Sequence, residues 1–406
     1  MRKKNNEQVL AKNQKRGGSA WIAIAAIILV SISLRPGIVS IGPISTFIQD
    51  DFNFSYSTTS LLITIPDLVM GLLALPTPWL ARRYGRNTVI LYALLLLTLS
   101  TLGRAFSPNT FTLLSTTVGV GAGIAIVGTL IGGFIKLKFP KKAALLMGIY
   151  TFSLSLGTAL AAGTTGIIAS NADSGWRLAS GIWALPGVLA IIAWIVITLQ
   201  GRKDSPGSQE VSEERVPIPY KNPTAWMIAL YFGCVNLLFY ALISWTSPMY
   251  QELGYSVTVS GFILLTFTVV FMIANPVFGA LSKSLDRRGW LAASSILAVV
   301  GLLLIAIWPN AAPFIFISIF AFGLGGAFTL SMTLPLDNTK TEEESNVWNG
   351  FVLTVGYLIA ATGPFLVGFM RDISGDFGTS IWFLVGITVL MLILTPFLKP
   401  NDRSLQ

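Results

Sequence analysis

A positive charge lies within an apolar stretch near the start of the chain. Arg35 is inside the run from Trp21 to Ile48, and it is the only basic residue that we expect to be unable to reach water from a loop. A cation at the middle of a membrane-spanning helix costs roughly 2.5 to 3.5 kcal/mol on insertion scales, so it normally faces a wet cavity or a polar partner instead of lipid. Arg35 is therefore the first residue that we expect to contact a solute.

A carboxylate in the next apolar stretch could meet Arg35. Asp67 follows Pro66, and counting about 1.5 Å per residue from the helix ends places Asp67 and Arg35 at similar depths. Such a carboxylate can be an ion-pair partner, a proton carrier that titrates when the pair breaks, or both. The sequence contains no histidine, which excludes a histidine proton relay. A direct ion pair with Arg35 is the favoured hypothesis for Asp67.

Polar side chains in other apolar stretches could face the same cavity. Asn236 lies one helical turn before Tyr240, so both occupy one face of a helix. Ser155 and Tyr357 lie in polar stripes of two further stretches. Structural alternatives stay open for these residues and for Arg35: a buried salt bridge, an interhelical hydrogen bond, or close helix packing.

The composition predicts the elements that must position these side chains. Hydrophobic residues make up 53% of the 406-residue chain, charged residues make up 11%, and the mean hydropathy is +0.71. A helix needs about 20 apolar residues to cross a bilayer core of about 30 Å, and the first stretch, although it follows a basic tail, is too long for a removed signal peptide. Twelve such stretches predict an all-α integral membrane protein: 20–48, 57–81, 88–106, 110–136, 142–170, 176–200, 224–251, 257–282, 290–308, 312–336, 346–370 and 379–398.

The stretches fall into two repeated groups of six. The segment 201–222 is rich in Ser, Pro, Glu and basic residues and is expected to be a cytoplasmic linker. When the halves are aligned, Gly121 falls opposite Gly323 and Arg35 falls opposite Asn236. Internal repeats of this kind are typical of secondary transporters in which two bundles rock around a central site. We predict two pseudo-symmetric six-helix bundles around a shared cavity, with the following division: tail 1–18, bundle 19–200, linker 201–222, bundle 223–398 and tail 399–406.

The net charge of +9 is explained by topology. If the N-terminus lies in the cytoplasm, every Lys and Arg falls inside except Arg35, Arg104, Arg177 and Arg371, as the positive-inside rule requires. This distribution predicts cytoplasmic termini and gives no reason to expect a nucleic-acid partner. Five basic residues of the cytoplasmic loops are predicted to form a gate: Arg82, Arg83, Arg86, Lys283 and Arg287.

The loop from Leu80 to Arg86 resembles the conserved loop between helices 2 and 3 of the major facilitator superfamily. In the usual form an acidic residue belongs to a charge network that holds the cytoplasmic side closed. Here Pro78 stands at the first Gly position and Arg82 at the acidic position. A closing network must therefore be built differently in this chain.

Short runs along nearly the whole chain carry a narrower resemblance. They are 34–36, 42–43, 121–126, 156–157, 175–177, 183–186, 238–241 and 356–358. Together they are similar to the cyanate and nitroimidazole transporter branch of that superfamily, which implies the major facilitator fold, a bacterial-type plasma membrane location and a small anion or nitro-aromatic substrate. The branch often has amides where this chain has Gly128, Ser155 and Val235, and an apolar residue in place of Asp67. Bare cyanate is therefore expected to fit poorly.

Three hypotheses follow. The first is a secondary active transporter of a small organic anion or nitro-aromatic compound that works by alternating access, with Arg35 as the charge anchor and Asn236, Tyr240 and Tyr357 as a hydrogen-bonding wall. The second is a proton-coupled exporter of neutral or cationic drugs with Asp67 as the coupling site. The third, a membrane enzyme or sensor, lacks a metal-ligand cluster, a nucleophile constellation or a phosphate loop in the sequence. We expect no enzyme activity, cofactor or metal, and a monomer, because each half supplies a wall of the cavity.

Overall fold

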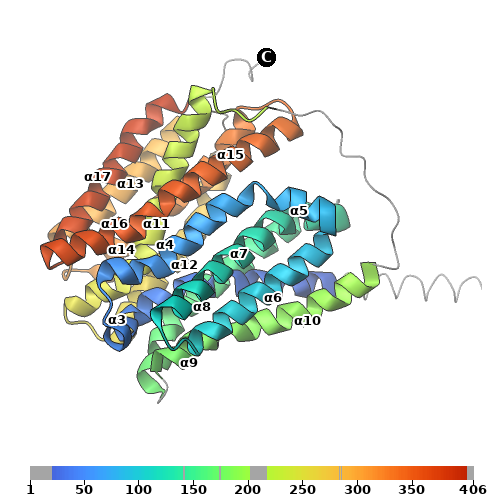
Figure 1. Ribbon diagram of the computed structural model, residues 1–406. Coiled ribbons are helices and arrows are strands. Elements are labelled where there is room, and N and C mark those ends of the chain that lie inside the picture. Colours follow the sequence, from blue (N-terminus) through green and yellow to red (C-terminus); the bar gives the residue numbers. More distant parts are fainter. Residues whose placement is uncertain are drawn as a thin grey trace, which may run out of the picture.

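The computed structural model describes residues 21–139, 142–172, 175–201, 217–282, 284 and 286–399. In this part of the chain every regular element is a helix (Figure 1). Twelve helical segments are long and apolar enough to cross a membrane, which confirms the predicted fold class. They are Trp21–Val39, Tyr56–Ala74, Arg86–Ala105, Thr110–Lys138, Leu145–Asn171, Gly175–Leu199, Pro223–Glu252, Val257–Leu281, Arg288–Ile307, Pro313–Asp337, Val347–Ser374 and Gly378–Phe397.

The first span is broken near its middle. Residues 21–34 are helical, Arg35 forms a turn, and the chain continues as α2 (Pro36–Val39) and α3 (Ile41–Phe52). Pro36 has no backbone N–H, so it cannot donate to the carbonyl of Ile32 as a helix requires. The predicted stretch 20–48 is therefore a series of short helical segments, and the break coincides with its one charged residue.

The other helices of the first half run from Tyr56 to Gly201. They are α4 (Tyr56–Ala74), α5 (Thr77–Tyr84), α6 (Arg86–Ala105), α7 (Thr110–Lys138), α8 (Ala143–Asn171), α9 (Gly175–Gly181) and α10 (Ala184–Gly201). Side-chain caps define several starts: Ser55 accepts a bond from the backbone N–H of Thr58 (3.1 Å) at α4, and Asn109 caps α7 in the same way. Such caps satisfy backbone donors that have no partner within the helix.

The second half contains seven α-helices. They are α11 (Pro223–Glu252), α12 (Val257–Leu281), α13 (Arg288–Ile307), α14 (Pro313–Asp337), α15 (Glu342–Ala360), α16 (Thr362–Ser374) and α17 (Gly378–Leu394). A short 3-10 turn, Thr395–Phe397, follows α17.

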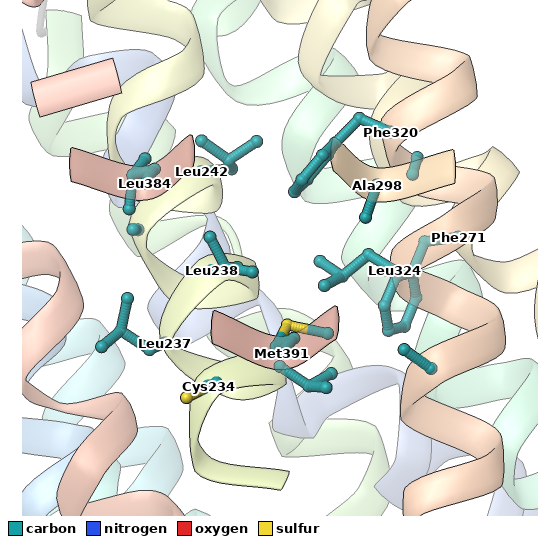
Figure 2. Close-up of a cluster of buried hydrophobic side chains, with 14 of the residues drawn as sticks. Cys234, Leu237, Leu238, Leu242, Phe271, Ala298, Phe320, Leu324, Leu384 and Met391 are labelled. Carbon is teal, nitrogen blue, oxygen red and sulfur yellow. The ribbon is translucent and has the colours of Figure 1, made fainter. Parts of the chain in front are cut away.

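The buried apolar side chains form two clusters, one in each half. One cluster lies almost wholly within residues 23–197 and the other almost wholly within 225–398. Figure 2 shows part of the second cluster, where side chains of α11, α12, α13, α14 and α17 pack together around Leu238. Each half therefore has its own core, which is the arrangement that lets two bundles move against each other.

The halves meet along three lines of contact: α8 with α12, α4 with α15 and α16, and α3 with α11. At the last of these a Cβ atom on Gly42 would lie 2.3 Å from the carbonyl oxygen of Ile243. The backbones of α3 and α11 thus touch, which only glycine permits.

Several predicted features lie outside the described residues. These are the tail 1–18, most of the linker 201–222 and the tail 399–406 apart from Lys399. The boundaries of the two bundles therefore stay predictions.

Candidate functional site

A cavity of about 690 Å³ lies between the two halves. Residues of α8 line it on one side, residues of α11, α12 and α14 line it on the other, and Arg35 contributes from the break in the first span. The lining includes Gly148 near the start of α8 and Gly279 and Thr333 near the ends of α12 and α14. The cavity therefore extends from the middle of the molecule to the end at which α8 begins.

The guanidinium of Arg35 lies at the inner part of this cavity, held by one contact from the opposite half. Its Nη1 donates to the hydroxyl of Tyr240, and its Cζ lies 5.8 Å from the centroid of the Tyr240 ring. The other N–H groups of Arg35 have no hydrogen-bond partner among the residues that the structure describes, and the side chain is only partly buried. These open donors match an oxygen-bearing anion or nitro group.

Arg35 also borders a second, smaller cavity of about 220 Å³. Its lining includes Tyr357, as well as Tyr150 and Gly128. The predicted site residue Tyr357 therefore faces this side pocket, with its ring centroid 6.4 Å from that of Tyr240. Tyr150 was missed by the sequence analysis, although it directly precedes the polar stripe that contains Ser155.

The structure brings Asn236 and Ser155 to opposite walls of the large cavity. The side-chain nitrogen of Asn236 donates to the carbonyl of Phe232 in its own helix (2.8 Å). Ser155 shares its polar stripe on α8 with Thr151 and Thr158, whose hydroxyls donate to carbonyls of α8. The Ser155 hydroxyl has no such contact in the described part of the chain and faces the cavity.

A further polar pair on the second half lines the cavity and was not predicted. The side-chain nitrogen of Asn275 donates to the carbonyl of Phe271 (2.7 Å), and the hydroxyl of Thr329 donates to the Asn275 side-chain oxygen. The signal that singled out Asn236, an amide within an apolar stretch, applies equally to Asn275.

Asp67 does not form the predicted ion pair. Its side chain is completely buried, and neither carboxylate oxygen has a hydrogen-bond partner in the part of the chain that the structure describes. Arg35 and Tyr240 are near enough to interact with it electrostatically, but the guanidinium donates to Tyr240. The partner of Arg35 is therefore the hydroxyl of Tyr240, from the opposite half, and not the predicted carboxylate of Asp67.

Arg35 is not the only embedded cation, contrary to prediction. Arg104, near the end of α6, is completely buried. Its Nη1 donates to the carbonyl of Gly37 (2.6 Å), which lies just beyond the break in the first span, and Nη2 lies 3.5 Å from the Thr117 hydroxyl. The sequence does not indicate this burial, because Arg104 lies one residue before the end of α6, where an arginine side chain can usually reach water.

At the end opposite the cavity, contacts between the halves are polar and close. Glu252 of α11 accepts a bond from the hydroxyl of Tyr56 of the first half (2.6 Å). Within the second half it accepts a bond from Nε of Arg371 (2.9 Å), and the Arg371 guanidinium lies 4.6 Å from the centroid of the Tyr56 ring. Asp372 accepts bonds from the backbone N–H groups of Tyr56 (2.9 Å) and Ser57 (2.8 Å) at the start of α4. We call these five residues, Tyr56, Ser57, Glu252, Arg371 and Asp372, the end clasp. None of them was predicted from the sequence to join the two halves.

The predicted gate residues of the first half make local contacts. Arg82 is exposed, Arg83 lies 5.4 Å from the Trp79 ring centroid, and Arg86 donates to the carbonyl of Gly133 (3.1 Å). Each of these contacts stays within the first half, so a gating role stays a prediction.

The predicted gate residues of the second half also pair locally. Arg287 forms an ion pair with Asp337 at the end of α14 and donates to the carbonyl of Ser282 (2.7 Å). Lys283 lies outside the described residues. The pseudo-equivalent residues Arg86 and Arg287 thus differ, because Arg86 binds a carbonyl and Arg287 binds a carboxylate.

Nearly the whole chain matches one family. The model of the Major Facilitator Superfamily aligns with residues 22–263 and 246–406. The chain belongs to the Major Facilitator Superfamily. It is therefore a multi-pass membrane protein of a transporter family, and the third hypothesis, an enzyme or sensor, is not supported.

The chain is similar to two proteins whose names state a substrate. The chain is 28% identical to the cyanate transport protein CynX of Escherichia coli (strain K12), over 93% of this chain and 98% of that protein. It is also 28% identical to the 2-nitroimidazole transporter of the same organism, over 94% of this chain and 95% of that protein. These similarities agree with the predicted branch.

The fold also matches a solved structure. A crystal structure of a bacterial homologue of the human lysosomal transporter Spinster, inward-facing and occupied, superposes with a TM-score of 0.77 at 18% identity, covering 93% of this chain and 96% of that one. This similarity concerns the fold alone.

Proposed function

We propose that the protein carries small planar organic anions or small nitro-aromatic compounds across a bacterial-type plasma membrane by alternating access. The observation that carries this proposal is the guanidinium of Arg35, whose open N–H groups lie in a cavity between two separately packed halves. The names of the two relatives at 28% identity support the substrate class. Both cavity walls come from one chain, so a monomer suffices.

The chemistry of Arg35 suits this class. A planar guanidinium presents parallel donors that match the two oxygens of a carboxylate or a nitro group. Tyr240 fixes the guanidinium from the opposite half and leaves the other donors open. The described residues that line the large cavity include no Asp or Glu that could bind a cationic drug, and the names of the two relatives point to other substrates. The second hypothesis, a proton-coupled exporter of neutral or cationic drugs, is therefore not favoured.

The closed end clasp and the cavity at the other end are the features expected of the inward-open state of an alternating-access cycle. The cavity reaches the end that the positive-inside rule assigns to the cytoplasm, and the end clasp closes the other end. For the cavity to open outward, the bonds of Tyr56 with Glu252 and of Ser57 with Asp372 must break. We propose that the loops with Arg82, Arg83, Arg86, Lys283 and Arg287 then come together as the inner gate.

Asp67 gives this cycle a candidate coupling group. An ionised carboxylate without a hydrogen-bond donor is costly to bury, so Asp67 must be compensated by a proton or by a donor that another state brings near. Asp67 lies on α4, which contacts α15 and α16 of the other half. Rocking of the halves would change its surroundings, and we propose that Asp67 exchanges a proton during the cycle.

Thermal stability of the purified protein tests the substrate class. A ligand that binds the folded form raises the apparent unfolding temperature. We expect 2-nitroimidazole or a small carboxylate such as benzoate to raise it, and a lipophilic cation such as tetraphenylphosphonium to have no effect. Stabilisation by the cation alone would contradict the proposal.

Cysteine labelling tests the alternating-access part. In a Cys234→Ala background, Ser155→Cys places a thiol in the large cavity, and we expect maleimide to label it readily from the cytoplasmic side. Arg371→Ala removes the stacking of this guanidinium on the ring of Tyr56 of the other half (4.6 Å to the ring centroid), which should favour the outward-open state and slow this labelling. Arg177→Ala is the matched control, because Arg177 pairs with Asp51 of its own half (2.8 Å). Equal labelling of all three proteins would contradict the role of the end clasp.

A further inference from the structure

The side-chain amide of Asn236 is held in one orientation by its own helix. Its nitrogen donates to the carbonyl of Phe232 at 2.8 Å. The reversed amide would place its oxygen against that carbonyl oxygen, two acceptors without a proton between them, which is unfavourable. The nitrogen is therefore committed to α11, and the oxygen is the group that remains for a ligand.

This oxygen faces the large cavity. Asn236 lines the cavity, and no donor of the described chain bonds to its side-chain oxygen. Since this oxygen has no partner among the described residues and is not fully enclosed by protein atoms, it is accessible from the cavity. Asn275, on the same side, differs because Thr329 already donates to its oxygen.

The cavity thus combines hydrogen-bond donors from Arg35 with an acceptor from Asn236. Tyr240, which holds the guanidinium of Arg35, lies one turn from Asn236 on α11. Residues four apart share one face of a helix, and Arg35 and Asn236 both line the large cavity. A ligand in the cavity can therefore meet the open donors of Arg35 and the side-chain oxygen of Asn236 together.

We propose that the transported compounds carry an N–H or O–H donor in addition to the nitro or carboxylate oxygens bound by Arg35, and that the side-chain oxygen of Asn236 recognises this donor. The inference rests on the proposed function and narrows it to N–H heteroaromatic nitro compounds or acids. A bare anion such as cyanate leaves the Asn236 oxygen without a partner, and an unmatched polar group in a binding site lowers affinity.

A pair of ligands tests the inference on the purified, full-length protein. 2-Nitroimidazole has a ring N–H, and 1-methyl-2-nitroimidazole keeps the nitro group but lacks this donor. We expect the wild-type protein to bind the N–H compound about tenfold more tightly, the effect of one well-formed hydrogen bond. The dissociation constants are measured by isothermal titration calorimetry.

Two variants separate hydrogen bonding from steric exclusion of the methyl group. Asn236→Leu keeps a side chain of similar size without an acceptor, and should bind both compounds with equal affinity. Asn275→Leu is the matched control and should keep the tenfold preference. A preference that persists in Asn236→Leu would overturn the inference, because size alone would then explain it.

If Asn236→Leu does not fold, the affinities of the wild-type protein for the two compounds still test the inference. Equal affinity for the two compounds would overturn the role of Asn236 but leave the proposed function standing, since both carry the nitro group that Arg35 is proposed to bind. Binding of neither compound, nor of benzoate, would overturn both.

Discussion

Two arginines of the first half, Arg35 and Arg104, reach into the interior of the fold, and their surroundings differ. Arg35 is partly exposed at the break in the first span, and among the described residues its one hydrogen-bond partner is the hydroxyl of Tyr240, which binds Nη1. Arg104 is completely buried and donates to the carbonyl of Gly37 and towards the hydroxyl of Thr117. One guanidinium faces a cavity, and the other is enclosed by the fold.

The difference shows that a charge inside a membrane span does not by itself mark a binding site. Arg104 binds a carbonyl immediately after the break at Pro36, a region where backbone acceptors lack their helical donors. We infer that Arg104 stabilises the broken conformation of the first span, and that this conformation places Arg35 in the cavity. Replacing Arg104 should therefore lower the stability of the protein, whereas replacing Arg35 should lower its affinity for the ligand.

The largest effect is expected for Arg35→Ala. Each lost hydrogen bond to a charged partner is worth about 1.5 to 3 kcal/mol, so losing two should weaken binding of 2-nitroimidazole or benzoate by at least about 100-fold. The ligand-free unfolding temperature should change little. Arg35→Lys keeps the charge but not the planar fork and should be intermediate. Undiminished stabilisation by ligand in Arg35→Ala would remove Arg35 from the site.

Asp67→Asn should come next, because Asp67 lies within electrostatic range of Arg35. The amide cannot carry a proton between the two sides, so uptake of labelled substrate into proteoliposomes should lose its dependence on a pH gradient. Exchange of substrate without a gradient should continue, since Arg35 remains. Gradient-driven transport at the wild-type rate would rule out Asp67 as the coupling group.

Arg104→Met should give the reverse pattern to Arg35→Ala. It leaves the carbonyl of Gly37 without a donor, which costs about 1 to 3 kcal/mol, so we expect a lower unfolding temperature in the absence of ligand. Affinity for 2-nitroimidazole should fall far less than in Arg35→Ala. A loss of affinity as large as that of Arg35→Ala, at unchanged stability, would mean that both arginines bind the ligand.

The smallest effect is expected for an arginine at the surface. Arg288 donates to Asp286 in the loop before α13 through Nε (2.9 Å) and Nη2 (2.7 Å), and these bonds hold the pKa of Asp286 below its usual value. A lowered carboxylate pKa stabilises the fold above the unfolded-state pKa, and the contribution disappears as the pH falls through the folded-state pKa. Arg288→Gln should lower the unfolding temperature slightly at neutral pH and not at all in strong acid. A large change at neutral pH would contradict the assignment of this pair to the exposed surface.

The sequence alone predicted much of the architecture. The length of the apolar stretches predicted the twelve spans, because a helix must be long enough to cross a bilayer. The single charge in the first stretch pointed to Arg35, and the amide in an apolar helix pointed to Asn236. These features depend on local composition, which can be read along the chain.

The remaining features depend on which helices pack together. That Tyr240, and not Asp67, binds Arg35 follows from the arrangement of the two halves. The same holds for the end clasp, whose residues come from α4, α11 and α16, and for the burial of Arg104 against Gly37.

Sequence by itself determined that this protein crosses a membrane twelve times and carries a cation in its first span, because hydrophobic length and charge are properties of each segment. Only the tertiary structure decided which polar groups are already paired and which remain open to a ligand. Hydrogen-bond partners come from segments far apart in the chain, so spacing along the sequence cannot specify them.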